Sequence, residues 1–429
     1  MSKKDMDNEA LETNRDFCVT PSIPTEKLDL TVVLQNKLGG VATFYANLLS
    51  TAHRDAFDLN IIYVSDDSSD SKMKSFFGLG REFHCHLSEP AGPWRIAKKP
   101  SQLISKAVCL WRNARKVSEL ISNEPGLVLV NHPIELLSLL LYPRPRKCVV
   151  FMCHDVAYLK WAVEYESVID VWIAHNTWVH RQLLERFPSR ADRIHFVRFG
   201  INIPNATVWP AHEELTIVYL ARLHVLKGIH DLVLVDKHLQ ERGVRVKWLV
   251  LGDGPEREAF LSTIQDKPHF HWESPADAAE CMRLASKGDI FLLPSSLDGT
   301  PLALLETMAL GLVPIVYEFC PGIHSVVSSE LGFVLPIGDT EGAARHIQSL
   351  DSNRSNLKRI GGNASAFIKA NFELEGCNSS YFELFGRYAR NERFRRISQR
   401  KRIGRLNIKV VPFIIAQIGQ YFKKQLTSR

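Results

Sequence analysis

The chain has 429 residues, of which 45% are hydrophobic, and this length is too great for one ordinary core, so we expect two domains and additional segments. Its eight cysteines form no C-x-x-C pair, which excludes a redox or zinc motif of that spacing and favours reduced thiols in the cytoplasm. The net charge of +6 is uneven: residues 387–429 hold 13 Lys and Arg against one acid, so this tail carries +12 and the remainder −6. The mildly acidic charge of the residues before 387 argues against extended binding to nucleic acid, and we expect no nucleic-acid partner.

In chain order, residues 1–27 are polar and predict a disordered leader without a signal peptide. Short apolar, β-branched runs then alternate with longer helical patterns. The expected strands are 28–34, 57–64, 126–130, 147–152, 170–174 and 194–197, followed by 215–221, 246–251, 289–293 and 313–317. Strands separated by helices predict parallel sheets built from right-handed β-α-β units.

Prolines and charged residues interrupt this alternation at 202–214, where we expect the linker between two domains. The predicted fold is α/β, with two Rossmann-like domains facing across a cleft and a basic C-terminal extension. The predicted segments are the leader 1–27, an acceptor domain 28–204, a donor-binding domain 205–372, a closing helix 373–390 and a basic, apolar tail 391–429.

A strand, a loop and a helix bring two carboxylates together after position 289. Thr300 is expected to cap the helix, Pro301 to begin it and Gly311 to end it. The free amides of the first turn favour an anion such as a diphosphate, and they belong to Thr300, Leu302 and Ala303. Carboxylates beside such a site accept hydrogen bonds from sugar hydroxyls. We therefore place Asp298 and Glu306 in a binding site for a sugar phosphate, although each alone would be an ordinary solvated acid.

Arg222 and Lys227 follow the strand 215–221, at the same predicted sheet edge. Positive charge is needed there if a diphosphate leaves as a glycosidic bond breaks. Two further turns carry paired glycines, Gly39 with Gly40 and Gly252 with Gly254, which allow a backbone to approach a ligand closely. Neither is a G-x-G-x-x-G fingerprint, and a plain tight turn explains the second pair equally well.

The segment 295–311 resembles the donor-site signature of the glycogen-synthase-like group of retaining glycosyltransferases (family 4, with the GT-B fold), S-x-x-E-G-x-P-x-x-x-L-E-A-M-A-x-G. The matching residues are Ser295, Gly299, Pro301, Leu305, Glu306, Met308, Ala309 and Gly311. Asp298 stands where the family has Glu, and Thr307 also departs from the pattern. The resemblance implies that Asp298 contacts the hydroxyls of the donor sugar and that Glu306 contacts the ribose of the nucleotide.

Residues 221–228 are similar to the family's G-R-L-x-x-x-K-G, with Ala221 in place of the first glycine, which implies that Arg222 and Lys227 hold the pyrophosphate. The glycine turns match the family's Gly-Gly loop and G-x-G-P turn. His154 resembles its histidine at the end of a first-domain strand, which binds the donor across the cleft. The implied catalytic residues are His154, Arg222, Lys227 and Asp298, and the implied donor-binding set adds Gly39, Gly40, Gly252, Gly254, Gly299, Thr300, Pro301, Leu302 and Glu306.

From this resemblance we expect a retaining transfer from a UDP- or GDP-sugar to a saccharide or lipid-linked acceptor, with no metal and no cofactor. Two alternatives remain: a nucleotide-sugar epimerase of the same architecture, and a non-catalytic, membrane-associated carbohydrate-binding scaffold. The tail combines basic residues with the apolar stretch 406–422, which favours an anionic membrane surface on the cytoplasmic side. Packing of that stretch on the protein body is the other interpretation.

Overall fold

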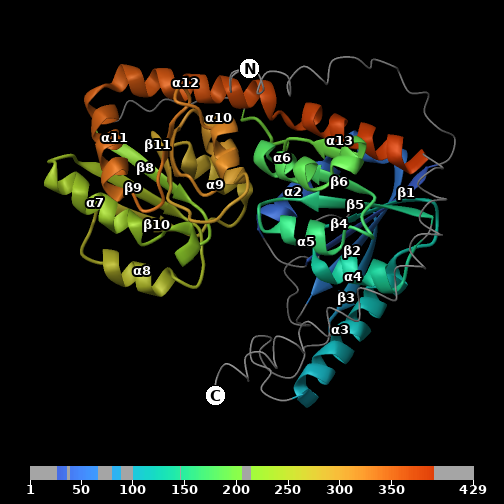
Figure 1. Cartoon of the computed structure of the whole chain (residues 1–429). Helices are drawn as coiled ribbons and strands as arrows, with labels where there is room; N and C mark the ends of the chain where they lie inside the picture. The colour runs from blue at the N-terminus through green and yellow to red at the C-terminus, as the bar shows by residue number, and fades with distance from the viewer. Residues whose placement is uncertain are drawn as a thin grey trace.

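The computed structural model describes residues 27–35, 39–65, 80–87, 100–144, 146–204 and 214–390, with backbone only for 100–107. The predicted leader up to residue 26 and the predicted tail from residue 391 lie outside these ranges. Two separate sheets, each fully parallel, organise the described residues, and helices cover them (Figure 1). This arrangement confirms the predicted α/β fold with two Rossmann-like domains.

The first sheet has the strand order β3-β2-β1-β4-β5-β6-β7, in which β1 lies at the centre and the chain winds outward in both directions. Its strands are β1 (Leu28–Gln35), β2 (Phe57–Ser65), β3 (Arg81–His86), β4 (Gly126–Val130), β5 (Lys147–Cys153), β6 (Val171–Ala174) and β7 (Ile194–Phe196). Its helices are α2 (Gly40–Ser50), α3 (Pro100–Leu120), α4 (Pro133–Leu141), α5 (Tyr158–Glu164) and α6 (Thr177–Arg186). The central strands β4, β5 and β6 are buried along their whole length, as a sheet covered on both faces requires.

The second sheet repeats the pattern in the order β10-β9-β8-β11-β12-β13. Its strands are β8 (Leu215–Leu220), β9 (Val246–Leu251), β10 (Phe270–Glu273), β11 (Ile290–Leu293), β12 (Val313–Tyr317) and β13 (Phe333–Leu335). Its helices are α7 (Asp231–Glu241), α8 (Arg257–Ile264), α9 (Ala278–Ala285), α10 (Leu302–Ala309), α11 (Thr340–Ser352) and α12 (Arg354–Asn371). Three strands were not predicted, and they are β3, β10 and β13.

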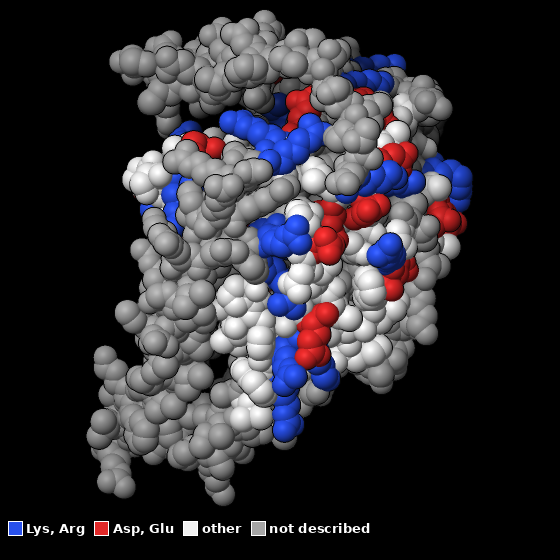
Figure 2. Space-filling model, turned by 90° about the vertical axis from the view of Figure 1, so that its right-hand side faces the viewer, with Lys and Arg blue, Asp and Glu red and all other residues white. Residues whose placement is uncertain are grey.

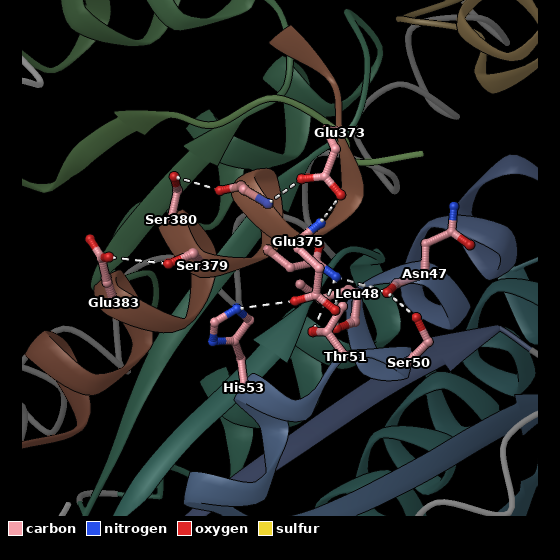
Figure 3. Close-up of polar contacts among 12 residues, drawn as sticks. Asn47, Leu48, Ser50, Thr51, His53, Glu373, Glu375, Ser379, Ser380 and Glu383 are labelled. Atoms are coloured by element: carbon pink, nitrogen blue, oxygen red, sulfur yellow. Dashed lines mark hydrogen bonds and ion pairs between the residues drawn. The ribbon is translucent and has the colours of Figure 1, made fainter. Parts of the chain in front are cut away.

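The last described helix, α13 (Leu374–Arg390), leaves the second domain and packs on the first, as Figure 1 shows. Its Asn378 amide, which is 1% exposed, donates to the carbonyl oxygens of Asn47 (2.9 Å) and Leu48 (3.3 Å) and to the Thr51 hydroxyl (3.3 Å). Nearby, the His53 ring lies 3.3 Å from the Glu375 carboxylate (Figure 3). The side chain of Asn378 therefore satisfies backbone carbonyls at the end of α2 and fixes α13 to the first domain.

No helix among the described residues combines the length and the apolar character that crossing a membrane requires.

Candidate active site

An ion pair joins two neighbouring loops of the second domain. Lys227 ends the short 3-10 helix η4 (Val225–Lys227) that follows β8, and Asp298 lies in the loop that follows β11. Because β8 and β11 pair in parallel, their carboxyl ends meet at one edge of the sheet. The Lys227 ammonium and the Asp298 carboxylate form an ion pair there, and both side chains remain partly exposed. The structure thus brings together two of the residues that the sequence motifs singled out.

The loop that holds Asp298 also touches the first domain. A Cβ built at Gly299 would lie too close to the carbonyl oxygen of His154 and 2.7 Å from Cβ of Asp155. His154 and Asp155 follow β5, so the carboxyl edges of the two sheets meet at this point. Burial raises the pKa of Asp155, the Asp298 carboxylate raises it further, and Lys227 opposes the shift. These charges therefore share one environment where the two domains meet.

A second contact between the sheet edges lies beside the first. Gly322 of the short helix η5 (Pro321–Ser325), which follows β12, packs against the side chain of Asn176, which follows β6. The side-chain oxygen Oδ1 of Asn176 accepts a hydrogen bond from the backbone N–H of Val179 (2.8 Å) and so caps α6. We refer to the two contacts, Gly299 on His154 and Asp155 and Gly322 on Asn176, as the edge interface.

His154 is buried at the edge interface beside a second histidine that the sequence reasoning missed, His175. The ring centroids lie 4.7 Å apart, and no ring nitrogen of either residue has a hydrogen-bond partner among the described residues. Burial lowers the pKa of His154 to about 3 and that of His175 well below its usual range, so both rings are neutral. Cys153 pairs with Ala174 between β5 and β6, so the next residues of the two chain segments, His154 and His175, lie side by side.

Glu306 lies on α10, near Cys281 of α9. Part of its side chain reaches the surface, but burial of most of the carboxyl raises its pKa to about 7. The helix itself differs from the prediction in one detail. It begins at Leu302, and Pro301 precedes it in an extended conformation (φ −64°, ψ 126°), so Thr300 is not the cap. Gly311 ends it with φ +92°, as expected.

The remaining predicted residues fall into two groups. Arg222 is exposed in the loop after β8, and Gly39 and Gly40, where α2 begins, would meet no atom within 4 Å if they carried a Cβ. The second glycine pair has a structural explanation, because a Cβ at Gly252 or Gly254 would collide with the carbonyl oxygens of Ala221 and Leu223. The turn after β9 therefore needs these glycines to approach the loop after β8.

Glu135 is a further buried acid at the carboxyl edge of the first sheet that the sequence reasoning missed. It is fully buried on the first turn of α4, and its Oε2 accepts from the backbone N–H of Asn131 (2.7 Å) and His132 (3.0 Å). Burial raises the pKa of Glu135 to about 8, although these hydrogen bonds oppose the shift. The carboxyl thus caps α4 in the manner of a capping box.

Two doubly wound, parallel domains that meet at the carboxyl edges of their strands define the class of two-Rossmann-domain, or GT-B, proteins. The Anabaena protein HepE, solved in complex with UDP and glucose, superposes with a TM-score of 0.64 over 84% of this chain and 99% of its own, at 15% sequence identity. Sucrose-phosphate synthase from Thermosynechococcus elongatus gives 0.65 over 84% and 99%, at 16% identity. At these identities the similarity establishes the fold.

Residues 207–367 match the family model of glycosyl transferases group 1. The amylovoran biosynthesis glycosyltransferase AmsK of Erwinia amylovora is 27% identical over 228 residues, which are 49% of this chain and 54% of AmsK. The chain spans about half the length of the curated relatives it matches. The second domain is thus similar to the group 1 glycosyltransferases, in agreement with the family that the motifs indicated.

Proposed function

We propose that the protein is a retaining glycosyltransferase that moves a sugar from a nucleotide-sugar donor to a saccharide or a lipid-linked saccharide. The observation that carries this proposal is the Lys227–Asp298 ion pair, placed where Gly299 meets the backbone of His154 and Asp155. A cation and a carboxylate at the meeting of two Rossmann-like sheets suit a ligand that combines a diphosphate with a polyol.

Each residue of the pair has a separate task in this proposal. Lys227, with Arg222 from the same loop, faces the diphosphate, and Asp298 accepts hydrogen bonds from hydroxyls of the donor sugar. Glu306 holds the ribose, and neutral His154 contributes a hydrogen bond to the donor from the first domain. HepE holds UDP and glucose, which supports a UDP-sugar as the first donor to test, with a GDP-sugar as the second.

The transfer itself needs charge stabilisation more than a nucleophile. As the glycosidic bond lengthens, the sugar approaches an oxocarbenium ion and negative charge collects on the leaving diphosphate. Lys227 and Arg222 stabilise that charge most strongly in the transition state, which is the condition for catalysis. The leaving phosphate oxygen then takes the proton of the acceptor hydroxyl, which attacks the same face of the sugar and so retains the anomeric configuration.

The name of AmsK, an amylovoran biosynthesis enzyme, supports polysaccharide biosynthesis as the process. We further propose that the protein works at the cytoplasmic face of a membrane, held there peripherally by residues 387–429. The first domain adds basic side chains on α3, and Figure 2 shows Lys and Arg side chains in the lower part of the described surface, beside an acidic one. Arg112, Arg115 and Lys116 are exposed there, together with Trp111.

A donor hydrolysis screen tests the function. The full chain is incubated with UDP- and GDP-sugars, and the released nucleoside diphosphate and the sugar are measured, with the anomer of each product assigned by NMR. Slow release of one diphosphate, accelerated by a saccharide acceptor with retention at the anomeric carbon, is the expected result. Release of an epimerised free sugar, unaffected by any acceptor, would assign an epimerase, and donor binding without turnover would assign a scaffold.

A further inference from the structure

A hollow lies at the amino edge of the first sheet, opposite to the edge where the two domains meet. Because neighbouring strands of this sheet pair in parallel, their first residues gather at one edge. Two cavities of about 270 and 460 Å³ lie there, and both are lined by Lys27, Asp58, Asn60 and Arg81. The larger one has the size of a small-molecule site, which is about 300–1,000 Å³. We call the two cavities together the amino-edge hollow.

The floor of the hollow is polar and is fixed by hydrogen bonds. Asp29 lines the larger cavity and is only 8% exposed. Its Oδ2 accepts hydrogen bonds from Asn60 Nδ2 (2.9 Å) and from the Ser122 hydroxyl (2.8 Å). Its Oδ1 accepts from the Thr31 hydroxyl (2.8 Å) and forms an ion pair with the buried Lys147 ammonium. The charge of Asp29 is therefore neutralised from inside the protein, and a ligand would meet a rigid polar floor.

Three exposed cations surround the hollow. Lys27 precedes β1, Arg81 begins β3 and Arg146 precedes β5. None of these three side chains has an ion pair or a hydrogen bond with another of the described residues, whereas Arg54, in the smaller cavity, donates to the Leu49 carbonyl oxygen (2.6 Å). Cations that no neighbour neutralises favour an anion, and phosphate oxygens are the acceptors that a guanidinium binds in pairs.

Two exposed carboxylates also line the hollow. Asp58 lines both cavities and Glu124 lines the larger one. A carboxylate repels a bare phosphate, but it accepts hydrogen bonds from hydroxyl groups. An inorganic anion would therefore be served by only part of this lining, and a molecule that carries both a phosphate and hydroxyl groups would be served by all of it.

We propose that the amino-edge hollow is a second ligand site, which binds a phosphorylated sugar and is separate from the donor site. Lys227 and Asp298 lie beyond the carboxyl ends of strands in the second domain, whereas the hollow lies at the amino ends of strands in the first. A molecule in the hollow therefore does not compete with the donor. The proposal concerns a different part of the molecule and does not depend on the proposed transfer reaction.

The test measures the binding of glucose 6-phosphate, inorganic phosphate and glucose to the full chain by calorimetry. The double variant Lys27→Ala/Arg81→Ala removes the two cations that line both cavities. The matched control is Arg112→Ala/Arg186→Ala, because these two exposed arginines of the first domain line neither cavity. UDP binding, measured for each variant by thermal shift, checks that the protein is folded and that the donor site is intact.

Two further variants separate the sites and the two parts of the ligand. Lys227→Ala should leave glucose 6-phosphate binding unchanged, because Lys227 belongs to the donor site. Asp58→Ala should weaken the binding of glucose 6-phosphate, which loses an acceptor for a hydroxyl, and should strengthen the binding of inorganic phosphate, which loses a repelling charge. A structural role of Asp58 alone would not produce these opposite changes.

We expect glucose 6-phosphate to bind at least about tenfold more tightly than inorganic phosphate or glucose. Lys27→Ala/Arg81→Ala should weaken this binding by about tenfold or more, while the control variant binds as the natural protein does and UDP binding is unchanged in both. Equal binding of glucose 6-phosphate and inorganic phosphate would overturn the proposal, since the hollow would then be a general anion site. Absence of binding, or binding that only Lys227→Ala abolishes, would overturn it as well.

Discussion

Lys227 and Asp298 form an ion pair although 71 residues separate them in the chain. Each residue lies just beyond the carboxyl end of a strand, and the two strands, β8 and β11, are neighbours. The pair therefore depends on the order of strands in the second sheet and not on local sequence. Its position at the edge interface makes it the natural starting point for mutational tests.

Replacing Lys227 or Arg222 by alanine should lower kcat by about 10²- to 10³-fold, with a much smaller effect on donor affinity. The reason is that negative charge grows on the diphosphate only as the bond breaks. Steady-state rates at saturating donor, beside calorimetric dissociation constants, separate the two effects. Lys237→Ala on α7 is the matched control, since that lysine is exposed and pairs only loosely with Glu241 (3.9 Å). If both variants kept the kcat of the natural protein, Lys227 and Arg222 would have no role in the mechanism.

Glu306 should make donor binding depend on pH near neutrality. Burial raises its pKa from 4.5 to about 7, so the charged form that accepts two ribose hydrogen bonds becomes dominant between pH 6 and pH 8. Donor affinity of the natural protein should rise over that interval. Glu306→Gln should give a flat profile and bind about tenfold more weakly at pH 8, because a hydrogen bond to a charged group contributes about 1.5–3 kcal/mol.

The raised pKa of Glu306 also makes the stability of the folded protein depend on pH, in the direction opposite to that of donor affinity. In the folded state the Glu306 carboxyl keeps its proton up to about pH 7, whereas in the unfolded state it loses the proton near pH 4.5. The free energy of unfolding therefore falls as the pH rises from 4.5 to 7. Glu306→Gln should therefore be more stable than the natural protein at pH 8, and the difference should vanish toward pH 4.5. Weaker donor binding with unchanged stability at every pH would contradict the burial of this carboxyl.

Gly299→Ala should keep the two sheet edges apart, because the added Cβ collides with the backbone of His154 and with Asp155. We expect donor binding by the second domain to survive and turnover to fall by at least about tenfold. Small-angle scattering should show a larger radius of gyration in the presence of UDP. Gly362→Ala on α12 is the control, since its Cβ would meet no atom within 4 Å. Unchanged turnover in Gly299→Ala would show that this contact is not needed.

Asn378→Ala should loosen α13 from the first domain. Three hydrogen bonds disappear, and the carbonyls of Asn47 and Leu48 lose a partner in a buried place, at a cost of about 1–3 kcal/mol. Urea unfolding followed by tryptophan fluorescence measures the loss, which should fall on the transition of the first domain. Ser380→Ala, at an exposed position two residues away, should leave both transitions unchanged.

The proposed membrane contact is tested by co-sedimentation with anionic liposomes. The full chain should pellet, and a version that ends at Arg390 should pellet far less, because basic residues near an anionic surface contribute about 1 kcal/mol each. Raising the salt to 1 M, where the Debye length is about 3 Å, should release the full chain. Equal pelleting of the two proteins would assign the contact to the first domain, for which Trp111→Ala on α3 is the next variant. Pelleting that ignores salt would contradict an electrostatic contact.

The strands that the sequence missed share a position and a character. β3, β10 and β13 each lie at an edge of a sheet, where one side of the strand has no neighbour among the described residues. β3 reads Arg-Glu-Phe-His-Cys-His and is mostly polar, and β13 has only three residues. Edge strands need no continuous apolar run, so hydrophobic patterning does not detect them. The central strands, which are buried on both faces, were all predicted.

The candidate site likewise contains residues that the sequence predicted and residues that it did not. Lys227, Asp298 and Glu306 were predicted because they stand in motifs with fixed spacing. The contact of His175 with His154 was not predicted, and neither were the hydrogen bonds of Asn378 to the end of α2. In both cases the partners are distant in sequence and no motif links them. Such contacts depend on strand order and on the return of α13, which local patterns do not encode.

The return of α13 also sets the order in which the protein completes its folding during synthesis. Tyr381 packs on Phe44, and Asn378 contacts Asn47 across 331 positions of sequence, so part of the cover of the first domain comes from the end of the described chain. The strands of the first sheet all leave the ribosome by residue 196, but α13 follows only after the whole second domain. At about 5–20 residues per second, roughly 10–40 s pass between the synthesis of residue 196 and that of α13. During this interval α13 does not yet cover the apolar side of α2, and chaperones bind exposed apolar surface of this kind.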